Sequence, residues 1–280
     1  MSIKLITDSA CGLPDDMLEK YNIEVLPFYV SHDDNQYKDG IDINIEKILK
    51  DMKEKNYFYK TSQIDPDTFK KAFEKNLKKH DQCLYIGLST GISGAYNSAV
   101  IAKKQLDKEK ANKIHLIDSK TASIGQGLIV RKAAKLLNKE KNIKKIKEKL
   151  QELKEKTHVY FTVDDLKYLY NGGRLNKVQS IIGGILNTKP LLTVDSNGDI
   201  IFHSKHRGHV RIKKKMKEFI NKEPREMVNI FYAGERKKAN EIKKYIKENT
   251  VTNKVLLSPV RVVVGAHIGP NSYGIAYMDS

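Results

Sequence analysis

The stretch Leu84–Leu106, LYIGLSTGISGAYNSAVIAKKQL, decides the fold of the first half of the chain. Its opening apolar run predicts a strand, and the apolar residues from Ala95 onward recur at steps of four, three and four, which predicts one face of a helix. Between them lies a loop rich in Ser, Thr and Gly. The unpaired N–H groups at such a helix start suit an anion, with Ser93 as a further donor and Gly94 opening the backbone. The simpler interpretation is that Ser93 caps its own helix.

Polar residues follow three separate strands of this first half. They are Thr7-Asp8-Ser9 after a strand at Ile3–Ile6, Ser89-Thr90 in the opening stretch, and Asp118-Ser119. Strands alternate with helices here, which predicts an α/β domain with a mostly parallel sheet. Ligands bind such sheets outside the carboxyl ends of the strands, so three polar strand ends favour a binding site there.

The second half reads as an α+β domain with a mostly antiparallel sheet. Late strands are predicted at Val255–Leu257 and Val260–Val264, and a single earlier strand at Ile23–Val30. We place the division between residues 1–156 and 157–280. Two domains imply a cleft between them, which is a common position for ligands.

The chain has 280 residues and a formal net charge of +17. Lysines are mixed with glutamates, as in Lys144–Lys156, which is typical of solvated helix surfaces. This distribution argues against a specific nucleic-acid partner and allows transient contact with an anionic membrane surface. The two cysteines form no disulfide framework, and no run of about 18 apolar residues occurs, so we expect a soluble cytoplasmic protein.

The sequence offers little support for a metal or a nucleotide. His203, His206 and His209 are spaced by threes, but Lys205 and Arg207 repel a cation nearby. Neither a Walker-type loop nor a strand followed by G-x-G-x-x-G is present. We therefore expect no metal site and no nucleotide cofactor.

An esterase is the main enzymatic alternative. Gly91–Ala95 nearly matches the nucleophile elbow G-x-S-x-G, and His267 lies downstream as a candidate base. Ala95 replaces the last glycine, however, and four residues separate the strand end at Leu88 from Ser93. A nucleophile needs a sharp turn directly after its strand, so Ser93 is the weaker candidate for attack and the better one for hydrogen bonding.

Five motifs stand in the order seen in one protein family, which the chain resembles over nearly its whole length. They are Thr7-Asp8-Ser9 with Leu13-Pro14, Thr61-Ser62-Gln63, Ile92–Ala99, Gly172-Gly173-Arg174, and Gly265–Pro270. The family is DegV, a group of bacterial fatty-acid-binding proteins with an N-terminal α/β domain and a C-terminal α+β domain. Some of its members are the substrate-carrying subunit of a fatty acid kinase.

The resemblance implies a function for individual residues. Thr61, Ser93, Gly94 and His267 would hold the fatty-acid carboxylate, and Arg174 would face a partner or the transferred phosphate. That partner would be a separate ATP-binding subunit that converts the carboxylate to an acyl-phosphate for phospholipid synthesis. The chain itself would be a carrier, with a long-chain fatty acid as its ligand and no cofactor.

Two departures from the family pattern leave these donors untouched. Ile64 replaces a frequent Pro after Thr-Ser-Gln, and Asn271 replaces a frequent Gly after Gly269-Pro270. An acyl chain of some fifteen methylenes contributes on the order of 12 kcal/mol gross on burial, at about 0.8 kcal/mol each. The apolar segment Ser180–Leu186 is the candidate wall for it, and an ordinary core helix is its alternative. The wall residues would be Ile181, Ile182, Ile185 and Leu186.

Overall fold

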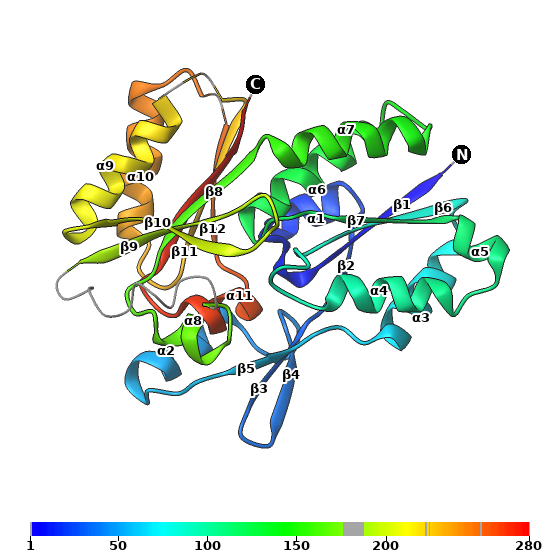
Figure 1. Cartoon of the computed structure of the whole chain (residues 1–280), viewed down its shortest axis with the longest axis horizontal. Helices are drawn as coiled ribbons and strands as arrows, with labels where there is room; N and C mark the ends of the chain where they lie inside the picture. The colour runs from blue at the N-terminus through cyan, green and yellow to red at the C-terminus, as the bar shows by residue number, and fades with distance from the viewer. Residues whose placement is uncertain (1, 176–187, 222, 224, 253, 280) are drawn as a thin grey trace.

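The computed structural model describes residues 2–175, 188–221, 223, 225–252 and 254–279. Its strands are β1 Ile3–Asp8, β2 Glu24–Leu26, β3 Tyr29–His32, β4 Asn35–Lys38, β5 Lys60–Ser62, β6 Gln82–Gly87, β7 Ile114–Asp118, β8 Thr157–Thr162, β9 Lys189–Val194, β10 Ile200–His206, β11 Met227–Tyr232, β12 Lys254–Pro259 and β13 Tyr273–Met278. Its helices are the 3-10 turn η1 Ser9–Cys11 and α1 Asp15–Lys20, α2 Ile45–Glu54, α3 Pro66–Leu77, α4 Ala95–Lys104, α5 Lys108–Asn112, α6 Ile124–Leu137, α7 Ile143–Glu155, α8 Lys167–Asn171, α9 Gly208–Asn221, α10 Lys237–Asn249 and α11 Val262–Ile268. The chain forms a two-domain α/β fold with three sheets (Figure 1).

The first sheet is parallel throughout, with the strand order β2-β1-β6-β7. This confirms the parallel sheet predicted for the N-terminal half. The polar strand ends also meet at one edge, where Asp8 accepts a hydrogen bond from the Leu88 N–H at 2.8 Å and the Thr90 hydroxyl donates to Asp118 at 2.6 Å. These groups mainly bind one another and thereby hold the loop between β6 and α4 in place.

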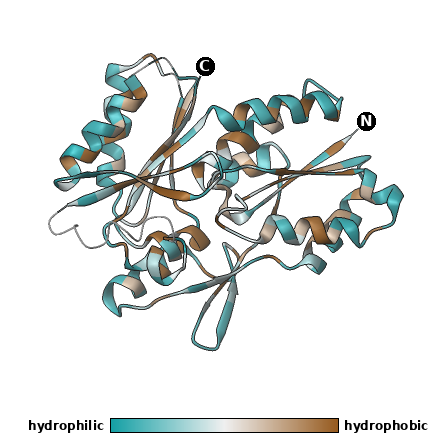
Figure 2. Cartoon of the chain, viewed as in Figure 1, coloured by the Kyte–Doolittle hydropathy of each residue, from teal (hydrophilic) through white to brown (hydrophobic). Residues whose placement is uncertain are grey.

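The second sheet has six strands in the order β10-β9-β8-β13-β11-β12. Each neighbouring pair is antiparallel except β11 and β12, which confirms a mostly antiparallel sheet. Helices α9 and α10 cover one face and enclose a core of their own. Figure 2 shows that these two helices are largely hydrophilic on their outer sides, while hydrophobic stretches lie along the strands.

Helix α6 packs against both large sheets. It contacts η1, β1 and β6 on one side and β8, β11 and β13 on the other. A side chain at Gly125 would collide with Val159 of β8, and one at Gly127 would collide with the backbone of Cys11. The two glycines therefore let one helix fit closely between two sheets. Because α6 belongs to both packing surfaces, the division at residues 156 and 157 stays a prediction.

The third sheet, β4-β3-β5, corrects the prediction of one strand at Ile23–Val30. Pro27 has no N–H and separates β2, which pairs with β1 in the parallel sheet, from β3, which pairs with β4 and β5. The local sequence does not reveal that the chain passes from one sheet to another at this proline. The consequence matters for function, because β5 carries Thr61.

The predicted strand at Val260–Val264 is also wrong, because Val262–Ile268 form helix α11. The Asp39 carboxylate accepts hydrogen bonds from the N–H groups of Val262 and Val263 at 3.1 and 3.3 Å, and so caps the helix from outside. Most of the helix is buried, and tertiary packing of this kind overrides the strand preference of a valine run.

Candidate functional site

Thr61, Ser93, Arg174 and His267 line one small cavity. Its volume is about 60 Å³. Both halves of the chain contribute to it, and none of its described lining residues is a carboxylate. The other lining residues are apolar: Phe28, Leu88, Ile92, Ala122, Leu169, Ile200, Val263, Val264 and Ile268.

Thr61 and His267 are hydrogen-bonded to each other although 206 positions separate them in the sequence. The distance from Thr61 Oγ1 to His267 Nε2 is 2.7 Å. The bond forms because β5 and α11 lie against each other. Burial, together with the positive charge of Arg174, lowers the pKa of His267 to about 3, so the imidazole is neutral near pH 7. The pair can therefore offer hydrogen bonds without carrying a charge.

The Gly-Gly-Arg motif has a structural reason for each glycine. A side chain at Gly172 would overlap the His267 ring, so only glycine lets α8 approach α11 this closely. Gly173 has φ +70°, a left-handed conformation that L side chains rarely adopt. The turn directs Arg174 into the cavity wall.

Arg174 joins this turn to the loop that carries Ser93. Its Nε donates to the Ile92 carbonyl at 3.1 Å, and its Nη1 donates to the Gly172 carbonyl at 2.5 Å. Burial lowers the pKa of Arg174, but a guanidinium stays protonated in proteins. A positive charge therefore stands at the cavity beside neutral donors.

Ser93 and Gly94 have both structural and binding capacity. Ser93 is not the N-cap of α4: its hydroxyl oxygen accepts a local hydrogen bond from the Ala95 N–H at 3.2 Å, and its own hydrogen is left to donate. Gly94 is the N-cap residue of α4, and a side chain there would overlap Gln63. Gln63 in turn donates to the Ser98 hydroxyl at 3.0 Å. Glycine at position 94 therefore leaves room for the Gln63 side chain, in addition to any access it gives a ligand.

Sequence reasoning missed Asp39 as a site-building residue. Asp39 is 3% exposed, caps α11 and accepts a hydrogen bond from the Ser9 hydroxyl at 2.7 Å. In the sequence, Asp39-Gly40 resembles an ordinary turn. A capping Asp can be recognised in a sequence when it directly precedes its helix. Asp39 caps a helix that begins more than 200 positions later, so the sequence carries no such signal.

The geometry differs from that of a Ser-His-acid hydrolase. Such a site needs a histidine bonded to the serine on one ring nitrogen and to an orienting carboxylate on the other. Here His267 Nε2 is bonded to Thr61, and Nδ1 has no hydrogen-bond partner within the described part of the chain. Across the described ranges, no group of three or more His, Cys, Asp or Glu side chains is placed to hold a metal ion.

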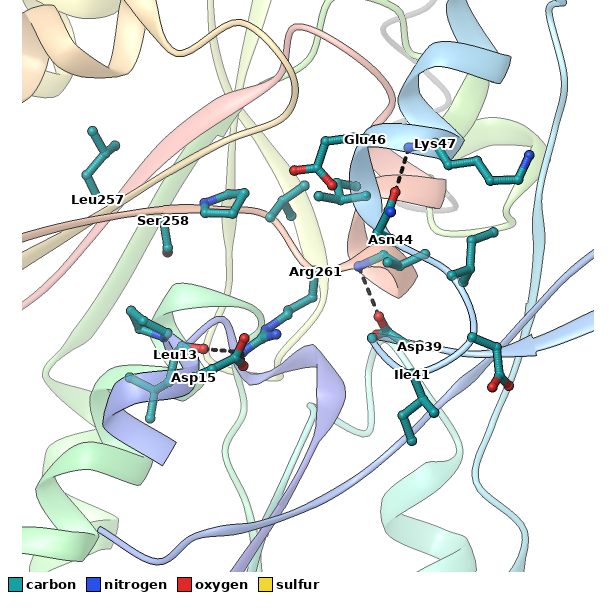
Figure 3. A pocket seen from close by; sticks show the side chains of 18 residues that line it. Leu13, Asp15, Asp39, Ile41, Asn44, Glu46, Lys47, Leu257, Ser258 and Arg261 are labelled. Atoms are coloured by element: carbon teal, nitrogen blue, oxygen red, sulfur yellow. Dashed lines mark hydrogen bonds and ion pairs between the residues drawn. The ribbon is translucent and has the colours of Figure 1, made fainter. Parts of the chain in front are cut away.

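A larger groove lies at the start of α11. Its volume is about 520 Å³, and Figure 3 shows Asp15, Asp39, Glu46 and Arg261 around it. None of the four predicted donors lines it. Arg261 is engaged there with the Leu13 carbonyl and with Asp15 at 2.6 Å.

The architecture defines a two-domain α/β protein whose two halves share one cavity with neutral donors, one guanidinium and apolar walls. The chain belongs to the DegV family: residues 2–280 match the family model described as "Uncharacterised protein, DegV family". A DegV domain-containing protein of Caldanaerobacter subterraneus is 33% identical, with 99% of each chain covered.

Solved structures agree with this assignment. DegV of Bacillus subtilis, described as a fatty acid binding protein, is 28% identical and has a TM-score of 0.90 with both chains fully covered. A stearic acid-binding protein of Eubacterium ventriosum is 26% identical, with a TM-score of 0.89 over 99% of this chain and 98% of that one.

Two further expectations concern a membrane span and the acyl-chain wall. No helix among the described residues is both long and apolar enough to span a membrane. The acyl-wall candidates Ile181, Ile182, Ile185 and Leu186 lie outside the described residues.

Proposed function

We propose that the protein binds one long-chain fatty acid, with its carboxylate at Thr61, Ser93 and His267 and at the backbone of Gly94. The observation that supports this most is the convergence of neutral donors and one cation in a cavity whose other walls are apolar. An ionised carboxylate resists burial unless it is well hydrogen-bonded. The Thr61 and Ser93 hydroxyls and the start of α4 meet that need, while the His267 imidazole holds Thr61 in place and Arg174 supplies a nearby positive charge.

The neutral state of His267 determines which way the hydrogen bond between His267 and Thr61 runs. With a proton on Nε2, the ring donates to Thr61 Oγ1, and the Thr61 hydroxyl is then free to donate to a carboxylate oxygen. This tautomer also leaves Nδ1 as an unprotonated acceptor beside Gly172, so no N–H is buried without a partner. The ring thus orients Thr61 toward the ligand.

The cavity accommodates the headgroup end of the ligand. At about 60 Å³ it is below the roughly 300–1,000 Å³ of typical small-molecule sites, so an acyl chain needs space beyond it. We propose that the chain continues from the apolar wall residues toward Ile181, Ile182, Ile185 and Leu186.

We further propose that the protein is a cytoplasmic carrier for an ATP-dependent fatty acid kinase. In this role, residues 1–156 carry the headgroup loops, and residues 157–280 supply the Arg174 turn, His267 on α11 and the acyl channel. Arg174 is half-buried and positively charged beside the proposed carboxylate, which suits a group that stabilises a transferred phosphate. Acyl-phosphate for phospholipid synthesis would be the product, and the basic chain would touch anionic membrane surfaces transiently.

Native mass spectrometry tests the ligand. Protein from a lipid-containing host should carry one fatty acid, and delipidated protein should take up palmitate or oleate at one site. A clean protein that takes up neither would contradict the proposal. Labelling of Ser93 by a fluorophosphonate probe would instead support the esterase.

The kinase role is tested with Arg174→Ala against Arg174→Lys. We expect Arg174→Ala to leave fatty-acid binding within about tenfold and to abolish acyl-phosphate formation with the kinase subunit, while Arg174→Lys retains part of the charge. Loss of binding in both variants would place Arg174 in the headgroup site instead.

A further inference from the structure

The β9–β10 hairpin reaches from the six-stranded sheet to the loop that carries Ser93 (Figure 1). At its turn, the Gly198 carbonyl accepts a hydrogen bond from the Ser89 hydroxyl at 2.8 Å. The two segments approach closely, since a Cβ built at Gly91 would lie 2.6 Å from the Gly198 oxygen and one at Gly198 would lie 3.0 Å from the Ser89 Cβ. The hairpin turn and the Ser89–Gly94 loop therefore fit together closely.

This contact closes one side of the cavity. Ile200, two residues beyond Gly198, lines the cavity together with Ala122 and with Ser93 of the contacted loop. Separating the hairpin turn from the loop would move Ile200 away from both. The opening would expose the apolar wall next to the headgroup donors.

The hairpin is anchored at its base, where Leu191 and Leu192 of β9 are buried and the Thr193 hydroxyl donates to the Val159 carbonyl at 2.7 Å, and its outer part has few ladder partners. β10 is the edge strand, and its register shifts between Phe202 and Ser204. Between β8 and β9 the pairing covers Tyr160 with Thr193 and Phe161 with Leu192, whereas β8 and β13 pair over six residues. Weakly held edge elements are the ones that open locally.

The neighbouring walls are anchored at several points. Helix α11 is held by the Asp39 carboxylate at its start and by the Thr61 bond at His267. β5 is part of a sheet with β3, and Leu88 is held by Asp8. Movement of any of these would displace the headgroup donors themselves.

We propose that the β9–β10 hairpin is the movable wall through which the fatty acid enters and leaves, with the Ser89–Gly198 contact as its closure. The proposal rests on the proposed fatty-acid function. It separates the part of the site that holds the carboxylate from the part that admits the chain. Closing the hairpin should therefore control the rate of exchange more than the affinity.

A reversible cross-link tests this. A Cβ built at Gly198 lies 3.0 Å from Ser89 Cβ, so a small backbone shift brings Ser89→Cys and Gly198→Cys to the separation of about 3.5–4.5 Å that a disulfide needs. The natural Cys11 and Cys83 are both buried, and each single variant is a control without a cross-link. Protein loaded with a fluorescent fatty acid is mixed with excess oleate, and release is followed over time.

We expect the oxidised double variant to release its ligand at least tenfold more slowly than the reduced form, with recovery on addition of a reductant. Equal rates at complete cross-linking would overturn the proposal. Because Gly198 has φ +86°, which strains a cysteine, Ser89→Ala in the natural background is the second measurement. It should release ligand about three- to tenfold faster at nearly unchanged affinity, and an unchanged rate would count against the hairpin. A wild-type protein that binds no fatty acid would instead refute the proposed function itself.

Discussion

The two hollows along α11 differ in size and in chemistry. The groove at the start of the helix has about 520 Å³ and is lined by four acidic residues, Asp15, Asp39, Asp42 and Glu46, and by two basic ones, Lys47 and Arg261, each of which already pairs with a carboxylate. The cavity farther along the helix has about 60 Å³, and its described lining contains hydroxyls, an imidazole and a guanidinium but no carboxylate. A fatty-acid carboxylate would be repelled in the groove and hydrogen-bonded in the cavity. Chemistry therefore favours the small cavity over the larger groove as the proposed headgroup site.

The same comparison shows two uses of polar groups around one helix. Asp39 is committed to the fold: burial raises its pKa, and its oxygens are taken up by Ser9 and by the start of α11. Thr61 and Ser93 keep hydroxyl hydrogens that can still be given to a ligand. Hydrogen bonds in the groove stabilise the helix that presents His267. In the cavity, the hydroxyl hydrogens of Thr61 and Ser93 remain available for a ligand.

Giving the cavity the chemistry of the groove should have the largest effect. Ser93→Asp places a carboxylate beside the ligand headgroup, where it repels the ligand and competes with it for Arg174; like charges side by side cost several kcal/mol, so we expect affinity to fall by at least about 100-fold. Ser93→Asn, neutral and similar in size to Asp, is the control and should lose much less. Displacement of a fluorescent fatty acid measures both, and equal losses would remove charge as the distinguishing feature.

Removing one donor should have the next largest effect. Thr61→Val keeps the shape of the side chain but loses the hydroxyl, and a hydrogen bond to a charged group is worth about 1.5–3 kcal/mol, or about 10- to 150-fold in affinity. Thr61→Ser retains the hydroxyl and should stay within a few-fold of wild type. Isothermal titration with palmitate would show whether Thr61 binds the carboxylate; a normal affinity in Thr61→Val would show that it only orients His267.

Disrupting the groove should change stability more than binding. Asp39→Asn offers one oxygen in place of two to the start of α11, so we expect the free energy of unfolding to fall by about 1–2 kcal/mol with affinity changed by less than about threefold. Glu46→Gln, exposed in the same groove, should cost only about 0.5 kcal/mol. Urea unfolding compares the two. An affinity loss as large as that of Thr61→Val would mean that α11 is positioned chiefly from the groove.

The smallest expected effect is on pH dependence. Because the pKa of His267 is about 3, below the value of about 6.5 in the unfolded chain, the ring should stay neutral from pH 5 to 8 and impose no step on affinity there. Its neutral form contributes stability that is complete above pH 6.5 and is lost as the pH falls from 6.5 toward 3. Nitrogen-15 NMR of the ring, with His267→Gln to assign the signal, measures this directly. Protonation above pH 5 would show that the ring binds the carboxylate as a cation.

Much of the fold follows from local pattern. The apolar runs predicted β1, β6 and β7, and the spacing from Ala95 onward predicted α4, because a helix face is encoded within a dozen residues. The predictions failed where a distant group decided the outcome. Pro27 marks a change between two sheets, and the second part of the run Val260–Val264 is helical from Val262 onward, where Asp39 caps α11.

The sequence by itself determined the residue types of the proposed headgroup site and the order of its motifs, because hydroxyl- and glycine-rich loops are local features. Only the tertiary structure brought Thr61 to His267 across 206 positions and placed the Gly198 turn on Ser89. It also showed that Gly172, Gly125 and Gly127 are small because neighbouring elements occupy the space of a side chain. Such contacts depend on how whole elements pack, and no short stretch of sequence encodes them.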